Sequence, residues 1–481
     1  MPTDSSASCP IEGTPASTST PIEGTRETIG RALEAALKEW GLIRVVTCTV
    51  DNALSNDTAL GYLKTFLREA NKTILGGEYL HVRCAAHILN LIVSDGMKNL
   101  HDSIARVRTV VRWVRSSPVR LKKFKVVARS AGITSKKRLC TDLTTQWNST
   151  FFMLEAAQEY KLAFALLDEE DIQYVKYFEH EAGLGKPMTE DWDVVSTFVD
   201  FLRFFYEITT ILSGSLYPTS HNFCQQICKV KEELDEIIAS GHTRLREMTL
   251  LMRAKYDKYW GGDFDRANML LYIAVAIDSR FKVDDMVYGL GIAYGQVWAE
   301  HIALSVKETL DRLFDEFTIL RGGNITAPTP IPPPVPNTRA KKKCIMDWGD
   351  RMKGNPLTRS TTEVKSEIDR YFGLDLEPYV RDFDILAWWK VHAPKYPVLA
   401  QIARSILAIP ISTVASESAF NTGGRVLDLF QSSLDPATVE SLICTSNWII
   451  GSPIHVPDVI DYDHVNAEEE GGDAPGSGNV T

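Results

Sequence analysis

The sequence lacks long apolar runs: none approaches the roughly 18 residues needed to cross a bilayer. Its first residues, MPTDSSASCPIEGTPASTST, hold neither the charged stretch nor the apolar stretch of a secretory signal. Cysteine is sparse, and 8 cysteines scattered over 481 positions fit reduced thiols better than a disulfide framework. We therefore expect an intracellular protein with no membrane partner.

The sequence also has no overall excess of positive charge. Its net charge of −10 argues against a uniformly basic nucleic-acid coat, although it leaves room for local patches. A hydrophobic content of 44% and a charged content of 24% are close to globular averages, which excludes a wholly disordered or collagenous chain. At 481 residues the chain is long enough for about two to four domains with apolar cores.

The first third of the chain has the pattern of a partial α/β domain. Residues 1–25 are rich in Ser, Thr, Pro and Gly, so we expect a disordered leader there. Apolar residues at helical spacing predict an amphipathic helix from Ile29 to Trp40. The β-branched run Arg44–Asp51 predicts a buried strand and Tyr79–Val82 a second short strand, with helix-like segments between and after them. This order is typical of a parallel α/β sheet.

The remainder of the chain is mainly helical in pattern. From about Thr150 to Leu320 we expect an all-α domain. A Pro-rich stretch, TAPTPIPPPVPNTRAKKK, predicts an exposed linker, and Ser366–Ile450 forms a compact apolar block. The acidic, Gly-rich end predicts a solvated tail.

Two carboxylates are candidates for chemistry. Asp51 follows the first predicted strand, where α/β folds usually place ligand and metal chemistry. Taken alone, however, the position is better explained by a helix cap or an Asx turn with Asn52. Glu417 lies in PISTVASESAFNTGG, where Ser412 can cap a helix. Its small neighbours would let that helix pack close to a sheet, but a lone Glu on a short helix is usually solvated.

Thiol and imidazole groups occur at two places with partial metal-site spacing. Cys84 and His87 have the spacing of half a zinc site, and His221, Cys224 and Cys228 could supply three ligands without an evident fourth. A structural zinc site needs four ligands. We therefore favour buried thiols beside a surface His and predict no structural zinc.

The segment from Ser103 to Thr141 contains no Asp or Glu and is strongly basic. Each Lys or Arg that reaches a phosphate releases counterions, so this segment is the best candidate for DNA backbone contact. Trp113, Phe124 and Trp147 could stack on bases. The alternative is a solvated helix face balanced by acidic helices elsewhere. The basic residues of the segment are Arg106, Arg108, Arg112, Arg115, Arg120, Lys122, Lys123, Lys125, Arg129, Lys136, Lys137 and Arg138.

Several segments together resemble the hAT transposase superfamily, particularly its plant zinc-finger BED, sleeper-like members. The resemblance runs from about Glu27 to Ile450, and its blocks occur in the order of the family. The blocks are TVDNALSND, HVRCAAHILNLIV, TTQWNSTFFML, AVAIDSRFK, SEIDRYF, FDILAWWK, YPVLAQIARSILAIPISTVASESAF and GGRVLD.

This resemblance implies a ribonuclease-H-like core interrupted by an all-α insertion, with a C-terminal hAT dimerisation region. In the family three carboxylates hold two divalent metals, Mg²⁺ or Mn²⁺, for attack on a phosphodiester. Asp51 matches the second carboxylate and Glu417 the third. Trp147 matches a tryptophan that stacks on a flipped base, and Cys84 and His87 match a CxxH pair near the active site.

The resemblance also implies the domain boundaries. We expect a disordered leader (1–25), a partial ribonuclease-H-like core (26–150) and an all-α insertion domain (151–325). A Pro-rich basic linker (326–355), a dimerisation region that completes the core (356–453) and an acidic disordered tail (454–481) come after these.

The chain departs from the family pattern in ways that bear on catalysis. The only Asp before Asp51 is Asp4, no strand-like sequence precedes the first helix, and no BED zinc finger is found. Gln146 stands where the family usually has Arg, and Ser279 where it usually has Pro. We therefore expect weak metal binding at Asp51 and Glu417, no strand transfer, and a two-stranded sheet whose core is either marginally stable or dependent on dimerisation.

These observations favour a transposase-derived protein that binds DNA, forms homodimers or pairs with related hAT proteins, and lacks catalysis. An active cut-and-paste transposase whose N-terminal part is absent, and a pure dimerisation module, are the alternatives. The family implies a nuclear protein, with faint support from the basic run Arg339–Lys343. The residues expected at the dimer interface are Leu386, Trp388, Trp389, Leu399, Leu442 and Trp448.

Overall fold

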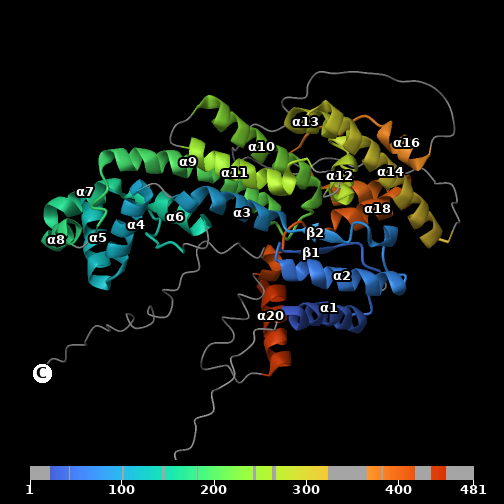
Figure 1. Cartoon of the computed structure of the whole chain (residues 1–481), viewed down its shortest axis with the longest axis horizontal. Helices are drawn as coiled ribbons and strands as arrows, with labels where there is room; N and C mark the ends of the chain where they lie inside the picture. The colour runs from blue at the N-terminus through green and yellow to red at the C-terminus, as the bar shows by residue number, and fades with distance from the viewer. Residues whose placement is uncertain are drawn as a thin grey trace, which may run out of the picture. The chain divides into compact units, whose positions relative to one another are not determined.

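The computed structural model describes residues 22–42, 44–99, 102–143, 147–180, 183–241, 245–262, 267–322, 366–380, 383–417 and 435–450. Residues 1–21 of the predicted leader, the Pro-rich linker and the acidic tail lie outside these residues, as does Gln146. The leader prediction is wrong for residues 22–25, because they form the first turn of α1 (Ile22–Glu39). The described residues fall into two compact units (Figure 1). One unit combines the residues up to Cys48 with Asn52–Leu80, and the other combines Thr49–Asp51 with the residues from His81 onward.

Two helices form most of the first unit. α1 (Ile22–Glu39) lies along α2 (Leu54–Glu69), and α1 confirms the amphipathic helix that the sequence predicts. The close approach of α1 to α2 requires a glycine at position 30, because a Cβ at Gly30 would lie 2.7 Å from the Tyr62 ring. The Tyr62 hydroxyl donates a hydrogen bond of 2.7 Å to Glu34 across the same contact.

Two short strands lie near the positions that the sequence predicts. The Cys48 amide of β1 (Cys48–Val50) donates to the Leu80 carbonyl at 2.6 Å. The Cys84 amide, just after β2 (His81–Arg83), donates to the Val50 carbonyl at 2.8 Å. The pairing advances in the same direction along both strands, so it is parallel. The described residues form one sheet, of two strands in the order β1-β2.

The first strand is shorter than the sequence predicts. The expected strand over Arg44–Asp51 is reduced to three half-buried residues. The cause is a separate parallel bridge between Val45 and Thr73, which pairs the start of the run independently of β1.

After β2, the second unit continues with α3 and a group of helices that pack in pairs. The end of α3 meets η2 (Met97–Asn99), and α9 packs against both α4 and α6 (Figure 1). The chain from Thr150 to Leu320 is helical wherever the structure describes it, apart from short turns, as predicted. The helices of this group are α3 (Ala85–Gly96), α4 (Asp102–Arg115), α5 (Pro118–Ser130), α6 (Trp147–Glu159), α7 (Lys161–Glu170), α8 (Ile172–His180) and α9 (Thr189–Leu212).

The remaining elements follow α9 in the chain, and several of them pack around α12, a strongly apolar helix. All eight residues of α12 (Met269–Ala276) are buried, because its sequence MLLYIAVA is apolar on every face. It contacts α10, α13, α14 and α18. The other elements of this group are η3 (Ser220–Asn222), α10 (Phe223–Ser240), α11 (Arg246–Trp260), α13 (Lys282–Tyr294), α14 (Gln296–Leu320), α16 (Glu367–Phe372), α17 (Ile385–His392), α18 (Pro397–Leu407) and α20 (Pro436–Ile450).

The DSRFK block joins the C-terminal region to α12 and α13. The Trp389 indole donates to the Ile277 carbonyl at 3.1 Å, and the Glu377 amide donates to the Ser279 carbonyl at 3.0 Å. Arg280 donates two hydrogen bonds to the fully buried Asp278, of 2.9 and 2.6 Å. This block therefore has a structural role. No helix in the described part of the chain meets the length and hydropathy needed to cross a bilayer.

Candidate functional site

The first candidate region lies at the carboxyl end of β1, where Asp51 is half-buried. Cys84 lies beside this end because its backbone amide donates a hydrogen bond to the Val50 carbonyl. Its thiol caps α3, because Sγ accepts a hydrogen bond from the His87 amide at 3.3 Å. The CxxH spacing therefore serves a helix cap here, with the Cys84 side chain buried and the His87 side chain half-buried.

The segment before Glu417 is tied to the same place by main-chain and side-chain bonds. The Thr49 hydroxyl donates to the Pro410 carbonyl at 2.5 Å, and the Ala85 amide donates to the Ile411 carbonyl at 2.8 Å. The Thr413 amide donates to Cys84 Sγ at 3.2 Å. As predicted, Ser412 caps the helical residues 414–417, since its hydroxyl accepts from the Val414 amide at 3.1 Å.

Thr413 links the buried thiol to the exposed carboxylate. Its hydroxyl lies 3.2 Å from Cys84 Sγ and 2.9 Å from Glu417 Oε1. A hydroxyl has one proton, so when it donates to Glu417 the sulfur contact needs the thiol proton of Cys84. A short series of hydrogen bonds thus joins the end of β1, Cys84 of the CxxH pair and Glu417. The sequence predicts the three parts, but nothing in its spacing identifies Thr413.

The carboxylates of this region do not make the two-metal centre that the resemblance implies. Within the described ranges, no group of three or more His, Cys, Asp or Glu side chains could hold a metal ion. Glu417 is exposed and its carboxylate already accepts the Thr413 hydrogen bond. Asp51 and Glu417 therefore offer too few ligands for octahedral Mg²⁺ or Mn²⁺, and weak metal binding by this pair stays a prediction.

The second His and Cys group lies in the second unit, where both thiols are buried and the imidazole is half-buried. Cys224 and Cys228 lie on α10, and burial lowers the pKa of the His221 imidazole to about 4. These three side chains do not form a metal site among the described residues. The sequence predicts a surface His beside the two thiols, but His221 is half-buried, with its Nδ1 atom shielded from solvent.

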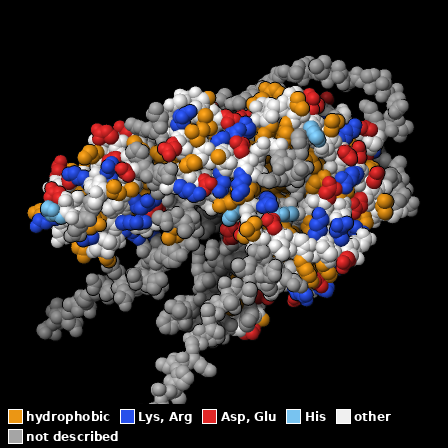
Figure 2. Space-filling view, in the orientation of Figure 1, with side chains coloured by type: hydrophobic (Ala, Val, Ile, Leu, Met, Phe, Trp, Pro, Cys, Tyr) orange, Lys and Arg blue, Asp and Glu red, His pale blue; other side chains and the backbone are white. Residues whose placement is uncertain are grey.

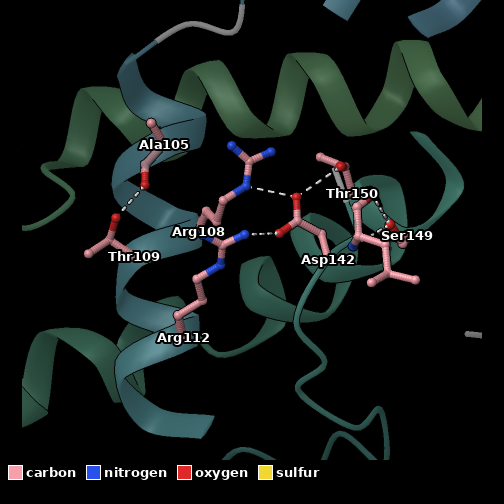
Figure 3. A network of polar contacts seen from close by, with 8 residues as sticks. Ala105, Arg108, Thr109, Arg112, Asp142, Ser149 and Thr150 are labelled. Atoms are coloured by element: carbon pink, nitrogen blue, oxygen red, sulfur yellow. Dashed lines mark hydrogen bonds and ion pairs between the residues drawn. The ribbon is translucent and has the colours of Figure 1, made fainter. Parts of the chain in front are cut away.

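The basic segment has two parts with different surroundings, and in the first part three arginines of α4 are ion-paired. Arg106 donates to Asp191 at 2.7 Å and to the Leu184 carbonyl at 2.9 Å. Arg108 and Arg112 both bind Asp142, at 2.7 and 3.3 Å (Figure 3). Asp142 is fully buried and also accepts from Thr150 at 3.0 Å. Buried carboxylates already neutralise these arginines, so DNA contact by them stays a prediction that the structure does not favour.

Other cations of the segment are also engaged. Lys123 pairs with Asp171 at 3.0 Å. Lys137 pairs with Glu155 and Glu159 at 3.1 and 2.8 Å. Arg120 lies over the Trp113 ring, 4.4 Å from its centroid. Arg115 and Arg138 make further interactions within the chain. For these residues the internal ion-pair alternative fits better than DNA contact.

The outer face of α5 keeps its cations exposed. Lys122, Lys125 and Arg129 are exposed and have no partner among the described residues, and their spacing of three and four residues places them on one helical face. Lys136, just after the helix, is also exposed. On the face of the molecule in Figure 2, by contrast, Lys and Arg lie among Asp and Glu rather than in one continuous patch.

The aromatic residues predicted to stack on bases are buried. Trp147, Trp113 and Phe124 are 3%, 3% and 2% exposed. Trp147 begins α6, and that end is fixed by Ser149, whose hydroxyl accepts from the Leu143 amide at 2.8 Å (Figure 3). In this conformation the three rings belong to the core, so none is available to a base.

The residues predicted at a dimer interface also divide by burial. Trp388, Trp389 and Leu399 are 9%, 4% and 0% exposed, so they pack within their own chain and the interface prediction is wrong for them. Leu386 and Leu442 are 45% and 46% exposed and remain available. Trp448 belongs to α20, but its side chain lies outside what the structure describes.

Three family descriptions match successive parts of the chain. Residues 82–201 match "ZBED1 RNase-like helical domain". Residues 221–317, which form helices from η3 into α14 here, match "hAT-like transposase, RNase-H fold". Residues 367–449 match "hAT family C-terminal dimerisation region". The chain therefore carries a region of the type through which hAT proteins self-associate.

Curated relatives match over most of this chain. The zinc finger BED domain-containing protein RICESLEEPER 2 of Oryza sativa subsp. japonica is 32% identical over 442 residues, covering 88% of this chain and 58% of the relative. The zinc finger BED domain-containing protein DAYSLEEPER of Arabidopsis thaliana is 29% identical over 426 residues, covering 89% of this chain and 57% of the relative. The chain thus spans less than two thirds of their length. With the three domain matches in order, these similarities show that the chain belongs to the hAT family.

Proposed function

We propose that this chain is a transposase-derived protein that self-associates and binds the DNA backbone, without catalysing transposition. The observation that carries the DNA-binding part is the outer face of α5, where Lys122, Lys125 and Arg129 are exposed and unpaired among the described residues. Phosphate contacts by exposed Lys and Arg supply sequence-independent affinity.

The geometry of α5 supports contact with several phosphates at once. With a rise of about 1.5 Å per residue, Lys125 and Arg129 lie about 4.5 and 10.5 Å along the helix from Lys122. The opposite side of the helix is anchored, because Phe124, Val127 and Ala128 are buried. The three cations therefore project from a fixed helix.

The loss of catalysis is proposed from the donor set. Asp51 and Glu417 are the family carboxylates present in the described residues near the end of β1, and they offer too few ligands for two divalent ions. A nicking assay on a supercoiled plasmid with Mg²⁺ or Mn²⁺ tests this part. Cleavage that disappears in Asp51→Asn would favour the alternative, an active transposase.

Self-association is proposed to use the exposed apolar residues of the matched dimerisation region. Leu442 on α20 is 46% exposed and Leu386 on α17 is 45% exposed. We expect light scattering on the full chain to give a dimer mass that falls toward the monomer in L386S/L442S. An unchanged dimer would place the interface elsewhere, and a monomeric wild type would remove self-association from the proposal.

DNA binding is tested by fluorescence anisotropy with a duplex across a salt series. Three phosphate contacts predict a slope of log K against log salt of about −3, and K122A/K125A/R129A should bring that slope close to zero. K123A/K137A is the matched control, because it removes cations that are ion-paired. Equal losses in both variants, or no binding by the wild type, would leave only the dimerisation role.

We also propose a nuclear location on family grounds. The basic run Arg339–Lys343 that supports it lies outside the described residues. Imaging of the full chain with a fluorescent tag, with and without Lys341–Lys343 replaced by Ala, tests this location.

A further inference from the structure

A recess of about 440 Å³ lies in the helical unit between α4, α7, α8 and the start of α9. This volume falls within the range of about 300–1,000 Å³ that is usual for ligand sites. None of the proposed DNA-contact residues of α5 lines the recess, so ligand binding there is independent of the proposed DNA contact.

The cations of the recess are already engaged. Arg106 binds Asp191 at 2.7 Å and the Leu184 carbonyl at 2.9 Å. Lys186 forms an ion pair with Asp168. The pKa of Asp191 lies below its usual range: burial raises it, but hydrogen bonds from the Met188 amide and the Ser103 hydroxyl, with Arg106, outweigh that effect. Asp191 is therefore ionised and holds Arg106 in place.

Two further carboxylates give the recess an excess of negative charge. Glu179 and Glu190 line it and are exposed. Within the described part of the chain neither forms an ion pair with Lys or Arg, and the His180 imidazole lies 4.0 Å from the Glu179 carboxylate. One oxygen of Asp168 is buried without a hydrogen-bond donor, so its charge is only partly compensated. Four carboxylates against two cations favour a cationic ligand, whereas an anion would be repelled.

The recess also has an apolar lining beside its carboxylates. Val175 and Phe178 on α8 and Leu184 and Met188 on the connecting segment line the recess, and Met188 is 65% exposed. Lysine and arginine side chains bury their aliphatic stems on apolar surface while their charged ends reach polar groups. An alkyl ammonium or guanidinium combines the two features that this lining offers.

We propose that the recess binds a lysine or arginine side chain of a partner protein. The charged end lies toward Glu179 and Glu190, and the stem lies against Phe178, Leu184 and Met188. The volume of about 440 Å³ accommodates such a side chain together with a neighbouring apolar residue of the peptide, which favours a peptide over a free amine.

Fluorescence anisotropy on the full chain tests the proposal. The probe is a labelled hexapeptide with one Arg flanked by Leu, and the matched peptide carries citrulline, which keeps the shape but removes the charge. We expect the Arg peptide to bind at least ten-fold more tightly. E179Q and E190Q should each weaken it about two- to five-fold, since each removes one partly exposed ion pair. M188S should also weaken it.

The control variant is E170Q, an equally exposed Glu on α7 that does not line the recess. Equal affinity for the Arg and citrulline peptides would overturn the proposal, as would equal losses in E170Q and E179Q. Competition by propylguanidine distinguishes a side chain of a partner protein from a free small cation. If propylguanidine bound with the same affinity as the Arg peptide, the assignment to a protein partner would be overturned.

Discussion

Helices α4 and α5 belong to one basic run of sequence, yet three arginines of α4 are ion-paired whereas three cations of α5 are exposed without a partner among the described residues. On α4 the arginines lie beside a broad buried face and meet buried carboxylates, Asp142 and Asp191. On α5 only Phe124, Val127 and Ala128 are buried, and Lys122, Lys125 and Arg129 face solvent. A run of one charge therefore does not define a binding surface. The position of each residue relative to the buried face decides whether its charge is available.

The largest expected effect separates a core tryptophan from a base-stacking one. Trp147→Ala removes a ring that is 3% exposed, so we expect the free energy of unfolding to fall by about 3–5 kcal/mol. Urea unfolding followed by circular dichroism measures this change. A loss below about 1 kcal/mol would mean that the ring is available for stacking. Trp147 would then not be a core residue, which would contradict the comparison of buried and exposed residues.

The next effect concerns the carboxylate that neutralises α4. Asp142→Ala leaves Arg108, whose side chain is 13% exposed, without its partner and also releases Arg112. Breaking a buried pair in this way should cost about 3 kcal/mol of unfolding free energy. Double substitution D142A/R108A should recover part of the loss, because the unpaired charge is gone. Full stability in D142A would show that the network in Figure 3 does not hold α4 to α6.

A smaller effect compares two lysines on the same helix. Lys125→Ala should reduce the slope of log K against log salt for DNA by about 0.9, because one phosphate contact is lost. Lys123→Ala should leave the slope unchanged, since Lys123 is bound to Asp171 at 3.0 Å. Anisotropy titrations of both variants measure this difference. The reverse order would mean that the ion-paired lysine is the one that leaves its partner for DNA.

The smallest effect is a dependence of the unfolding free energy on pH. Burial raises the pKa of Asp171, but hydrogen bonds from Lys123 and from the amides of Gln173 and Tyr174 outweigh it, so this pKa lies below its ordinary value of 3.8. A lowered pKa stabilises the fold above pH 3.8, and that contribution is lost as the pH falls through the value in the folded protein. The dependence of unfolding free energy on pH, measured between about pH 5 and 2, should therefore flatten in Asp171→Asn. An identical pH dependence in the variant would contradict this role for the ion pair.

Periodicity is sufficient to predict the helices, because apolar spacing directly reflects which face is buried. The predicted helix near Ile29–Trp40 and the helical region after Thr150 are both present. The predicted first strand is too long, since the sequence cannot show that Val45 pairs with Thr73 rather than continuing β1. Local pattern therefore gives element type more securely than pairing.

The candidate sites require information that lies far apart in the chain. Arg106 and its partner Asp191 are 85 residues apart, so no local pattern reveals that ion pair. Asp142 is easier to find, because it directly follows the acid-free segment, and Glu155 comes soon after it. Family resemblance predicts the neighbourhood of Asp51, Cys84 and Glu417. Thr413, which joins thiol and carboxylate, is visible only in the fold.

Lysine acetylation of the full chain, followed by mass spectrometry with and without duplex DNA, tests the central claim most directly. We expect DNA to protect Lys122 and Lys125 while the reactivity of Lys123 and Lys137 stays unchanged, because only the first two are exposed without a carboxylate partner among the described residues. Protection of Lys123 and Lys137 alone, or equal protection of all four, would contradict the assignment of DNA contact to the outer face of α5.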